Sequence, residues 1–457
     1  MPFREPPLRP WQERALAALA DWEEGSFLVS AAPGAGKTRP ALVVARDLLR
    51  RRAVSRIVVV CPTTPLTRQW SEAAARLQIE LVPDAATPRP PAGFHGVAVT
   101  YARVCAGGAG WGGRSAGPGT LVIADEAHHL GEDLAWGTGF ARAFGAAPRW
   151  LLLSGTPFRS DGCPIPGVAY DAQGVALPDV AYTYAEAVRE GVCRPVTFVP
   201  YDGTLTWRSG EDVVESSFSD ELTGREAGRR YRTAISTELA DGLPRILRAA
   251  HDRLAGLRAG EHRDAGGLVV AADGAHAGRL AALLRDISGA VPTVVLHTDP
   301  AAHAKLHVFR TSSSPWVVAV NMVSEGVDIP RLRVGVYATA AKTPLAFRQI
   351  VGRFVRTLPG RPDDERSWLF LPADPVLRTM AGEVEQELRP LLRVLDEPEG
   401  LDEHLTRRES ERGEQPQFVP VAADVAPQLA LFGGGAPAGL APVDAPAPVV
   451  PVQPVAP

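Results

Sequence analysis

The sequence predicts an α/β fold of two tandem domains, each with a mostly parallel sheet. Short apolar runs alternate with amphipathic helical stretches along most of the 457 residues, a pattern typical of parallel strands joined by covering helices. The predicted strands of the first domain lie at 27–30, 57–61, 97–100, 121–124 and 150–153, and its main helices at 39–52, 65–77 and 133–144. The predicted strands of the second domain lie at 267–271, 293–296, 315–320, 334–337 and 367–371.

A glycine-rich loop follows the first predicted strand. Gly34 and Gly36 let the backbone approach a phosphate closely, so that backbone N–H groups and the start of the next helix can surround the anion. Lys37 would reach the outer phosphates of ATP, and Thr38 would take one position on Mg²⁺. The usual first glycine of this motif is Ala31 here, so a glycine-rich turn before an ordinary helix stays open for this segment alone. The predicted cofactor-binding residues of the loop are Pro33, Gly34, Ala35, Gly36, Lys37 and Thr38.

Two adjacent carboxylates follow the apolar run 120–124. At the end of a buried parallel strand, Asp125 can hold Mg²⁺ through its water shell, and Glu126 can position and activate the water that attacks the γ-phosphate. An isolated Asp-Glu pair would more readily be an acidic turn that caps the next helix. Downstream of a Lys-Thr loop, that alternative is the less favoured interpretation.

The motif Asp125-Glu126-Ala127-His128 resembles the DEAH signature of the superfamily 2 DEAD/DEAH-box helicases and translocases. Further motifs of that family follow in its order: Arg9-Pro10-Trp11-Gln12, Ser154-Gly155-Thr156-Pro157, Ser324-Glu325-Gly326-Val327-Asp328 and Gln349-Ile350-Val351-Gly352-Arg353-Phe354-Val355-Arg356. The resemblance covers 8–356. It implies two tandem RecA-like (P-loop NTPase) domains with ATP and Mg²⁺ in the cleft between them.

The resemblance also implies roles for single residues. Gln12 would read adenine, and Gly326 and Asp328 would contact the nucleotide from the second domain. The residues that would couple hydrolysis to domain movement are His128, Ser154, Thr156 and Gln349. The segments 62–65, 68–70 and 100–101 occupy positions where the family's first domain holds a nucleic-acid strand. The predicted nucleic-acid residues are Thr63, Arg68, Thr100, Arg159 and Thr298.

The last motif has a physical interpretation of its own. Thr343 and Pro344 form a good N-cap and first-turn pair, and the segment 359–360 (Pro-Gly) would stop the helix. Gln349, Arg353 and Arg356 would then lie on roughly one helix face. Two guanidiniums on one face could meet a polyphosphate held by the other domain and stabilise charge during phosphoryl transfer. Solvated helix arginines are the alternative.

The sequence between the two sheets and at the C-terminal end fits neither domain. We expect a first domain at 1–159, a connector element at 160–240, a second domain at 241–400 and a Pro/Ala-rich disordered tail at 410–457. Within the connector, 196–199 and 204–207 are expected to pair as short strands. A cluster of arginines there could contact a phosphate backbone, although a solvated helix face is the favoured interpretation: Arg225, Arg229, Arg230 and Arg232.

The composition of the chain excludes several classes of protein. The net charge of −4 argues against a wholly basic nucleic-acid coat protein, but it allows a local basic groove. The four cysteines lack C-x-x-C spacing, so neither a zinc site nor a disulfide framework is indicated. Without a long apolar span or a signal-like N-terminus, a cytoplasmic protein with no membrane partner is expected. The oligomeric state is not set by the sequence.

The expected function is therefore ATP-dependent helicase or translocase activity. The DEAH form, the arrangement at 154–159 and the short 9–12 segment look more like the restriction-enzyme and DNA-repair branches than the RNA-specific branch, so DNA is favoured over RNA. A different possibility is a nucleic-acid-activated ATPase or motor subunit without strand-separating activity, which serves a partner protein of a restriction, repair or phage-defence complex. An adaptor without turnover is disfavoured because the residues expected to perform hydrolysis are present: Lys37, Asp125, Glu126, Arg353 and Arg356.

Overall fold

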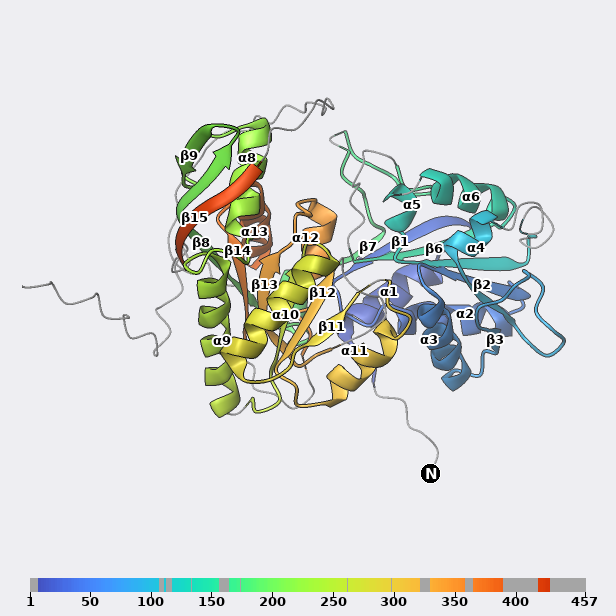
Figure 1. Ribbon diagram of the computed structural model, residues 1–457. Coiled ribbons are helices and arrows are strands. Elements are labelled where there is room, and N and C mark those ends of the chain that lie inside the picture. Colours follow the sequence, from blue (N-terminus) through green and yellow to red (C-terminus); the bar gives the residue numbers. More distant parts are fainter. Residues whose placement is uncertain are drawn as a thin grey trace, which may run out of the picture.

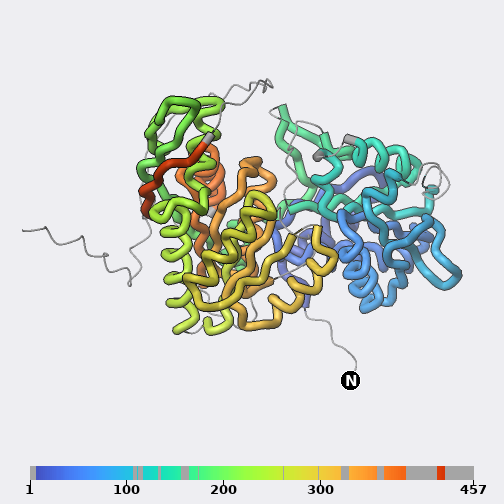
Figure 2. The backbone as a smooth tube through the Cα atoms, in the orientation of Figure 1, coloured from blue at the N-terminus to red at the C-terminus, as the bar shows by residue number. Residues whose placement is uncertain are grey.

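Two α/β units, each built around its own sheet, make up the computed structural model (Figure 1). The structure describes residues 7–106, 111, 117–132, 134–155, 164–172, 174–260, 262–296, 298–320, 329–357, 365–388 and 418–427. Figure 2 follows the chain from the first unit, in blue and cyan, to the second, in yellow and orange, where the red strand of the C-terminal end lies beside green segments.

The first sheet contains seven parallel strands in the order β3-β4-β2-β5-β6-β1-β7. The bounds are β1 (Gly25–Ala31), β2 (Arg56–Cys61), β3 (Leu81–Val82), β4 (Gly96–Thr100), β5 (Thr120–Asp125), β6 (Arg149–Ser154) and β7 (Val180–Tyr182). The five predicted strands of this unit are confirmed. The strands β3 and β7 were not predicted, because two or three residues are too few to show a periodic pattern.

Helices cover both faces of the first sheet (Figure 1). One face is covered by α1 (Pro10–Ala20), α2 (Thr38–Arg50) and α3 (Thr64–Arg76), and the other by α4 (Tyr101–Ala106), α5 (His129–Glu132) and α6 (Leu134–Phe144). The side chains of successive strand residues point to opposite faces, so each strand contributes to two separate apolar cores. The positions of α2, α3 and α6 agree with the helices predicted from the sequence.

The second sheet has the order β11-β12-β10-β13-β14-β8-β15, and β9 pairs with β8. Its strands β10 (Gly266–Ala271), β11 (Thr293–Val295), β12 (Trp316–Val320), β13 (Leu332–Ala338) and β14 (Ser367–Pro372) confirm the five predicted runs. The helices of this unit are α8 (Gly224–Ala234), α9 (Leu243–Ala259), α10 (Gly274–Ser288), α11 (Ala302–Thr311), α12 (Pro344–Val351) and α13 (Pro375–Leu388).

The predicted connector divides between the two sheets. It supplies the edge strand β7 of the first sheet, then α7 (Tyr184–Arg189), which contacts α13, and then the long strand β8 (Val196–Ser209) of the second sheet. The prediction that 196–199 and 204–207 pair with each other is wrong, since both belong to this one strand. The first half of β8 runs parallel to β14, and its second half pairs antiparallel with β9 (Asp212–Ser216).

Ten residues of the segment predicted to be disordered form the strand β15 (Phe418–Pro427), antiparallel to β8. Ala423 and Val425 of β15 are buried in the core of the second unit. An edge position can recruit a segment with little strand propensity, because most of the stabilisation comes from pairing and burial. The remaining residues of the predicted tail lie outside the described residues.

Two of the clustered arginines are structural. Arg229 and Arg230 of α8 are buried. Arg230 stacks over Phe218 and donates to the backbone carbonyls of Ser217 and Asp220, while Arg229 pairs with Glu226. For these two residues the structure contradicts both the solvated face and the phosphate contact, because their guanidiniums bind within the fold: Arg229 contacts Glu226 and Ser209 of β8, and Arg230 contacts the segment that follows β9.

The backbone of β10 approaches a tryptophan ring closely. Gly267 pairs in register with Trp316, and a Cβ added to Gly267 would lie 2.3 Å from the Trp316 ring. We predict that Gly267→Ala lowers the free energy of unfolding by about 1–3 kcal/mol through overpacking. In Gly278→Ala, the matched control in α10, the added Cβ meets no atom within 4 Å, so stability should hold or rise by about 0.5–1 kcal/mol. Urea denaturation followed by tryptophan fluorescence measures both, and equal stability of the two variants would contradict the packing described here.

Candidate nucleotide site

The glycine-rich loop joins β1 to α2 at the carboxyl edge of the first sheet. Gly34 and Gly36 have φ angles of +78° and +84°, which L side chains rarely adopt, so both glycines are required by the backbone. Ala31 is the last residue of β1 and is 1% exposed. Because its backbone is ordinary strand, alanine can replace the usual first glycine there without strain. The loop therefore has the form of a phosphate-binding loop that leads into a 13-residue helix.

The N-terminal segment is attached to this loop. The Arg9 guanidinium donates to the carbonyls of Gly34 and Ala35 at 3.2 and 2.9 Å, and the Trp11 indole donates to the Ala35 carbonyl at 3.1 Å. Gln12 donates from its amide to the Gly36 carbonyl at 3.0 Å and accepts from the Arg9 backbone. The Gln12 amide thus holds the loop in this structure, and its reading of adenine stays a prediction.

The two carboxylates lie opposite the loop. Asp125 ends β5, and Glu126 follows in a left-handed backbone conformation with φ of +50°, a strained geometry for a residue other than glycine. The Glu126 carboxylate lies 3.5 Å from the Lys37 ammonium. The structure therefore brings the predicted phosphate-binding lysine and the predicted general base into direct contact.

The Asp125 carboxylate is 7% exposed and is held by two donors. Its Oδ2 accepts from the Trp70 indole at 2.7 Å, and its Oδ1 accepts from the Glu126 backbone at 3.1 Å. Each oxygen keeps further lone-pair capacity. Carboxylate and hydroxyl oxygens are the ligands that Mg²⁺ prefers, so Asp125 and Thr38 fit the predicted metal.

The pKa values of Asp125 and Glu126 shift in opposite directions because the two carboxyl groups have different surroundings. Burial raises the pKa of Asp125, and the neighbouring Glu126 carboxylate raises it further. Burial also raises the pKa of Glu126, but the Lys37 ammonium, with the neighbouring His128 and His129, outweighs that effect and lowers its pKa overall. Glu126 is therefore the ionised partner at neutral pH, as a group that orients a water must be. A divalent cation beside Asp125 would favour the ionised form of that residue as well.

Three predicted coupling residues form one polar chain across the two units. His128 Nδ1 lies 3.0 Å from the Ser154 hydroxyl, and His128 Nε2 lies 3.3 Å from the amide nitrogen of Gln349 on α12. Ser154 is fully buried at the end of β6. Thr156, the fourth predicted member, lies outside the described residues.

The arginine motif reaches the loop by a different geometry from the predicted one. Thr343 caps α12 as expected, since its side chain accepts from the Ala346 backbone. The helix ends at Val351, however, so the prediction of one helix face shared by Gln349, Arg353 and Arg356 is wrong. Beyond Gly352 the chain turns and forms an isolated bridge to Cys193.

This turn places Arg356 beside the phosphate-binding loop. A Cβ added to Gly34 would lie 3.4 Å from Arg356 Cγ, and one added to Gly352 would lie 3.0 Å from Pro33. Arg353 is partly exposed, one residue beyond Gly352. The motif and the loop therefore lie in direct apposition.

The segment between the sheets contacts both halves of this site. The Cys193 thiol donates to the Pro33 carbonyl at 3.3 Å, and the Arg194 backbone donates to the Val355 carbonyl at 2.6 Å. Burial raises the pKa of Cys193 to about 12, so the thiol stays protonated and can donate. Sequence reasoning missed this contact, because no motif surrounds Cys193 and the pairing partners are more than 150 residues away.

The predicted nucleic-acid residues are distributed over the carboxyl edges of both sheets. Thr63 precedes α3, Arg68 is exposed on that helix, and Thr298 is exposed beyond β11. Thr100 ends β4 and is only 8% exposed, so it offers little surface to a strand. Gly326, Asp328 and Arg159 lie outside the described residues. The nucleotide contacts of Gly326 and Asp328 and the nucleic-acid roles of the other residues stay predictions.

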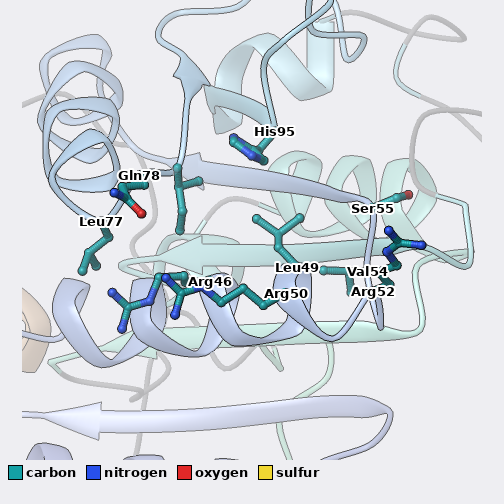
Figure 3. Close-up of a pocket in the computed structure, with 10 residues that line it drawn as sticks. Arg46, Leu49, Arg50, Arg52, Val54, Ser55, Leu77, Gln78 and His95 are labelled. Atoms are coloured by element: carbon teal, nitrogen blue, oxygen red, sulfur yellow. The ribbon is translucent and has the colours of Figure 1, made fainter.

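A cavity of about 430 Å³ lies away from this site (Figure 3). It is formed near the C-terminal ends of α2 and α3 and the start of β2, at the opposite edge of the first sheet. Its lining includes Arg46, Leu49, Arg50, Leu77 and His95. Neither the glycine-rich loop nor the carboxylate pair lines it, so this cavity is not the nucleotide site.

Within the part of the chain that the structure describes, no helix is both long and apolar enough to span a bilayer.

Comparisons with known proteins identify relatives of this chain in sequence and in fold. Residues 5–85 match the family model of the type III restriction enzyme res subunit. Uncharacterized protein Rv2917 of Mycobacterium tuberculosis (strain ATCC 25618 / H37Rv) is 42% identical over 444 residues, which are 94% of this chain and 72% of that protein. Uncharacterized protein ML1624 of Mycobacterium leprae (strain TN) is 40% identical over 441 residues, 94% of this chain and 73% of that protein.

Solved structures share the fold at low identity. A fragment of a putative HsdR subunit of a type I restriction enzyme from Vibrio vulnificus YJ016 has a TM-score of 0.53 at 16% identity, covering 81% of this chain and 64% of that one. S. cerevisiae Dbp5 bound to RNA and ADP BeF3 has a TM-score of 0.51 at 14% identity, with coverages of 84% and 88%. The ATP-dependent type ISP restriction-modification enzyme LlaBIII bound to DNA has a TM-score of 0.52 at 14% identity, with coverages of 84% and 30%.

The contact of Lys37 with Glu126 generates a prediction on nucleotide binding. Lys37→Ala should weaken the binding of a fluorescent ATP analogue by about tenfold or more, because the loop loses its charge on the outer phosphates. Lys305→Ala is the matched control, since Lys305 pairs with Asp299 in the second unit. Titration of both variants in Mg²⁺ measures the effect. Equal affinities would place the nucleotide elsewhere.

Proposed function

We propose that this chain, which belongs to one family with the mycobacterial proteins Rv2917 and ML1624, is a superfamily 2 ATP-dependent helicase or translocase that acts on DNA. The observation that carries the proposal is the convergence of three motifs on one site where the two units meet. The Lys37 ammonium lies 3.5 Å from the Glu126 carboxylate, and Arg356 of the second unit packs against Gly34 of the same loop. A phosphate-binding lysine, a general base and an arginine from another domain form the set that phosphoryl transfer requires.

Each residue then has a distinct role. The loop amides and Lys37 bind the phosphates of ATP, and Asp125 with Thr38 holds Mg²⁺. Bound Mg²⁺ would neutralise charge on the outer phosphates and orient them. Glu126, ionised at neutral pH, orients water for attack on the γ-phosphate and takes its proton. Arg356 and Arg353 supply positive charge from the second unit when the cleft closes.

The chain of His128, Ser154 and Gln349 supports coupling between hydrolysis and movement. Gln349 belongs to α12 of the second unit, whereas the other two residues end or follow strands of the first sheet. A change at Glu126 can therefore reach the second unit through one neighbouring histidine, which also lies 3.5 Å from the Glu126 carboxylate. Closing and opening of the cleft around one nucleic-acid strand would follow each cycle.

DNA is proposed as the polymer on the basis of the restriction-enzyme likeness. Residues 5–85 match a restriction-enzyme family model, and LlaBIII is described as bound to DNA. Dbp5 is described as bound to RNA, which makes RNA the necessary comparison in any test. The same likeness favours a second candidate, in which the chain is the motor subunit of a restriction, repair or defence complex and does not separate strands itself.

The role of Glu126 generates a sharp prediction. Glu126→Gln should retain ATP binding but lower turnover by at least about a hundredfold, because the amide cannot accept the proton of the attacking water. The variant should also hold DNA more tightly in ATP than in ADP, since the closed cleft persists. Fluorescence anisotropy of labelled DNA and steady-state phosphate release measure the two effects.

Glu186→Gln, at the first turn of α7 and away from the carboxylate pair, is the matched control. Unchanged turnover in Glu126→Gln would contradict the assignment of the base. A strand-displacement assay beside a translocation assay, both with the unmodified chain, then separates a helicase from a motor subunit that only moves.

A further inference from the structure

Two aromatic residues of the first unit converge on Asp125. The Trp70 indole donates to Asp125 Oδ2 at 2.7 Å, and the Tyr101 hydroxyl donates to the Asp125 backbone carbonyl at 2.8 Å. Both aromatic residues are 1% exposed. The side chain and the backbone of the predicted metal-holding residue are therefore fixed by two different helices, because Trp70 belongs to α3 and Tyr101 begins α4.

These are the same two helices whose first residues are expected to hold a nucleic-acid strand. Thr63 precedes α3, and Thr100 precedes α4. The two helix starts lie side by side, since Cys61 at the end of β2 pairs in register with Thr100 at the end of β4. Trp70 and Tyr101 lie in segments where the family's strand contacts are expected. The structure turns both residues inward, so neither can contact a strand itself.

We propose that Trp70 and Tyr101 are positioning residues through which a strand bound at the starts of α3 and α4 sets the geometry of Asp125. This inference rests on the proposed function, because it assumes that the chain binds nucleic acid and uses Mg²⁺ with ATP. A displacement of α3 by less than 1 Å would take the Trp70–Asp125 contact from a short hydrogen bond to the limit of one. Displacement of α4 acts on the Asp125 backbone.

A displacement of the Asp125 backbone would also affect Glu126. The next residue is Glu126, whose left-handed backbone is held in a narrow region of conformational space. The Glu126 backbone N–H also donates to Asp125 Oδ1. A shift at Asp125 therefore reaches both the metal-holding carboxylate and the water-orienting carboxylate, without any contact between the strand and the nucleotide.

The experiment compares Trp70→Phe with the matched control Trp150→Phe in the full chain. Trp150 also lies in the first unit, and its indole donates to the Phe144 carbonyl at 3.1 Å, away from Asp125. The first readout is the Mg²⁺ concentration that half-saturates binding of a fluorescent ATP analogue, which requires no turnover. The second is the ratio of ATP hydrolysis with and without single-stranded DNA.

We expect Trp70→Phe to raise the half-saturating Mg²⁺ concentration by about tenfold, the effect of losing a hydrogen bond to a charged group, and to reduce the stimulation by DNA at least about fivefold, the order of coupling energies between linked sites. Trp150→Phe should change neither. If Trp70→Phe does not fold, as judged by thermal unfolding, Tyr101→Phe replaces it and should act in the same direction.

An unchanged Mg²⁺ requirement in these variants would overturn the positioning role. A raised Mg²⁺ requirement with unchanged stimulation would overturn the link to strand binding. A wild-type chain that no polymer stimulates would instead contradict the proposed function and, with it, the strand-dependent part of this inference. The Mg²⁺ titration would still decide whether Trp70 positions Asp125.

Discussion

The parallel register of β1, β6 and β5 is the constraint on which the whole site depends. Ser30 pairs with Ser154, and Asp125 pairs with Leu153, so three strands end at the same edge within two residues of each other. Parallel sheets place their ligands at this edge. The register therefore sets the glycine-rich loop, the carboxylate pair and the buried serine side by side, although they lie at 31–38, 125–126 and 154 in the sequence.

The segment between the two sheets links the glycine-rich loop of the first unit to the arginine motif of the second unit. It contacts the loop at Pro33 and the arginine motif at Val355, so its position is tied to both halves of the candidate site. The apolar core is continuous across this segment, with Cys193 and Phe354 among its members. Relative movement of the two units must therefore pass through contacts that also touch the nucleotide site.

Local sequence patterns predicted the site better than the outer parts of the fold. Gly34 and Gly36 were recognisable because a phosphate-binding backbone needs left-handed conformations, and Asp125 because it ends a run of apolar residues. The end of α12 at Val351 was not predictable, since it depends on a bridge to Cys193 far along the chain. The same holds for β15, which is a strand because β8 offers a free edge, and for Trp70, whose indole needed an acceptor that the sequence does not identify.

The proposed function requires that nucleic acid stimulate ATP hydrolysis between the two units. Its most direct test is steady-state ATP hydrolysis by the full chain, alone and with single-stranded DNA, duplex DNA and RNA at fixed low salt, since phosphate contacts weaken as salt rises. We expect stimulation, strongest with DNA, that disappears when Lys37 is replaced by alanine. Hydrolysis that is indifferent to every polymer, with ATP still bound, would contradict it.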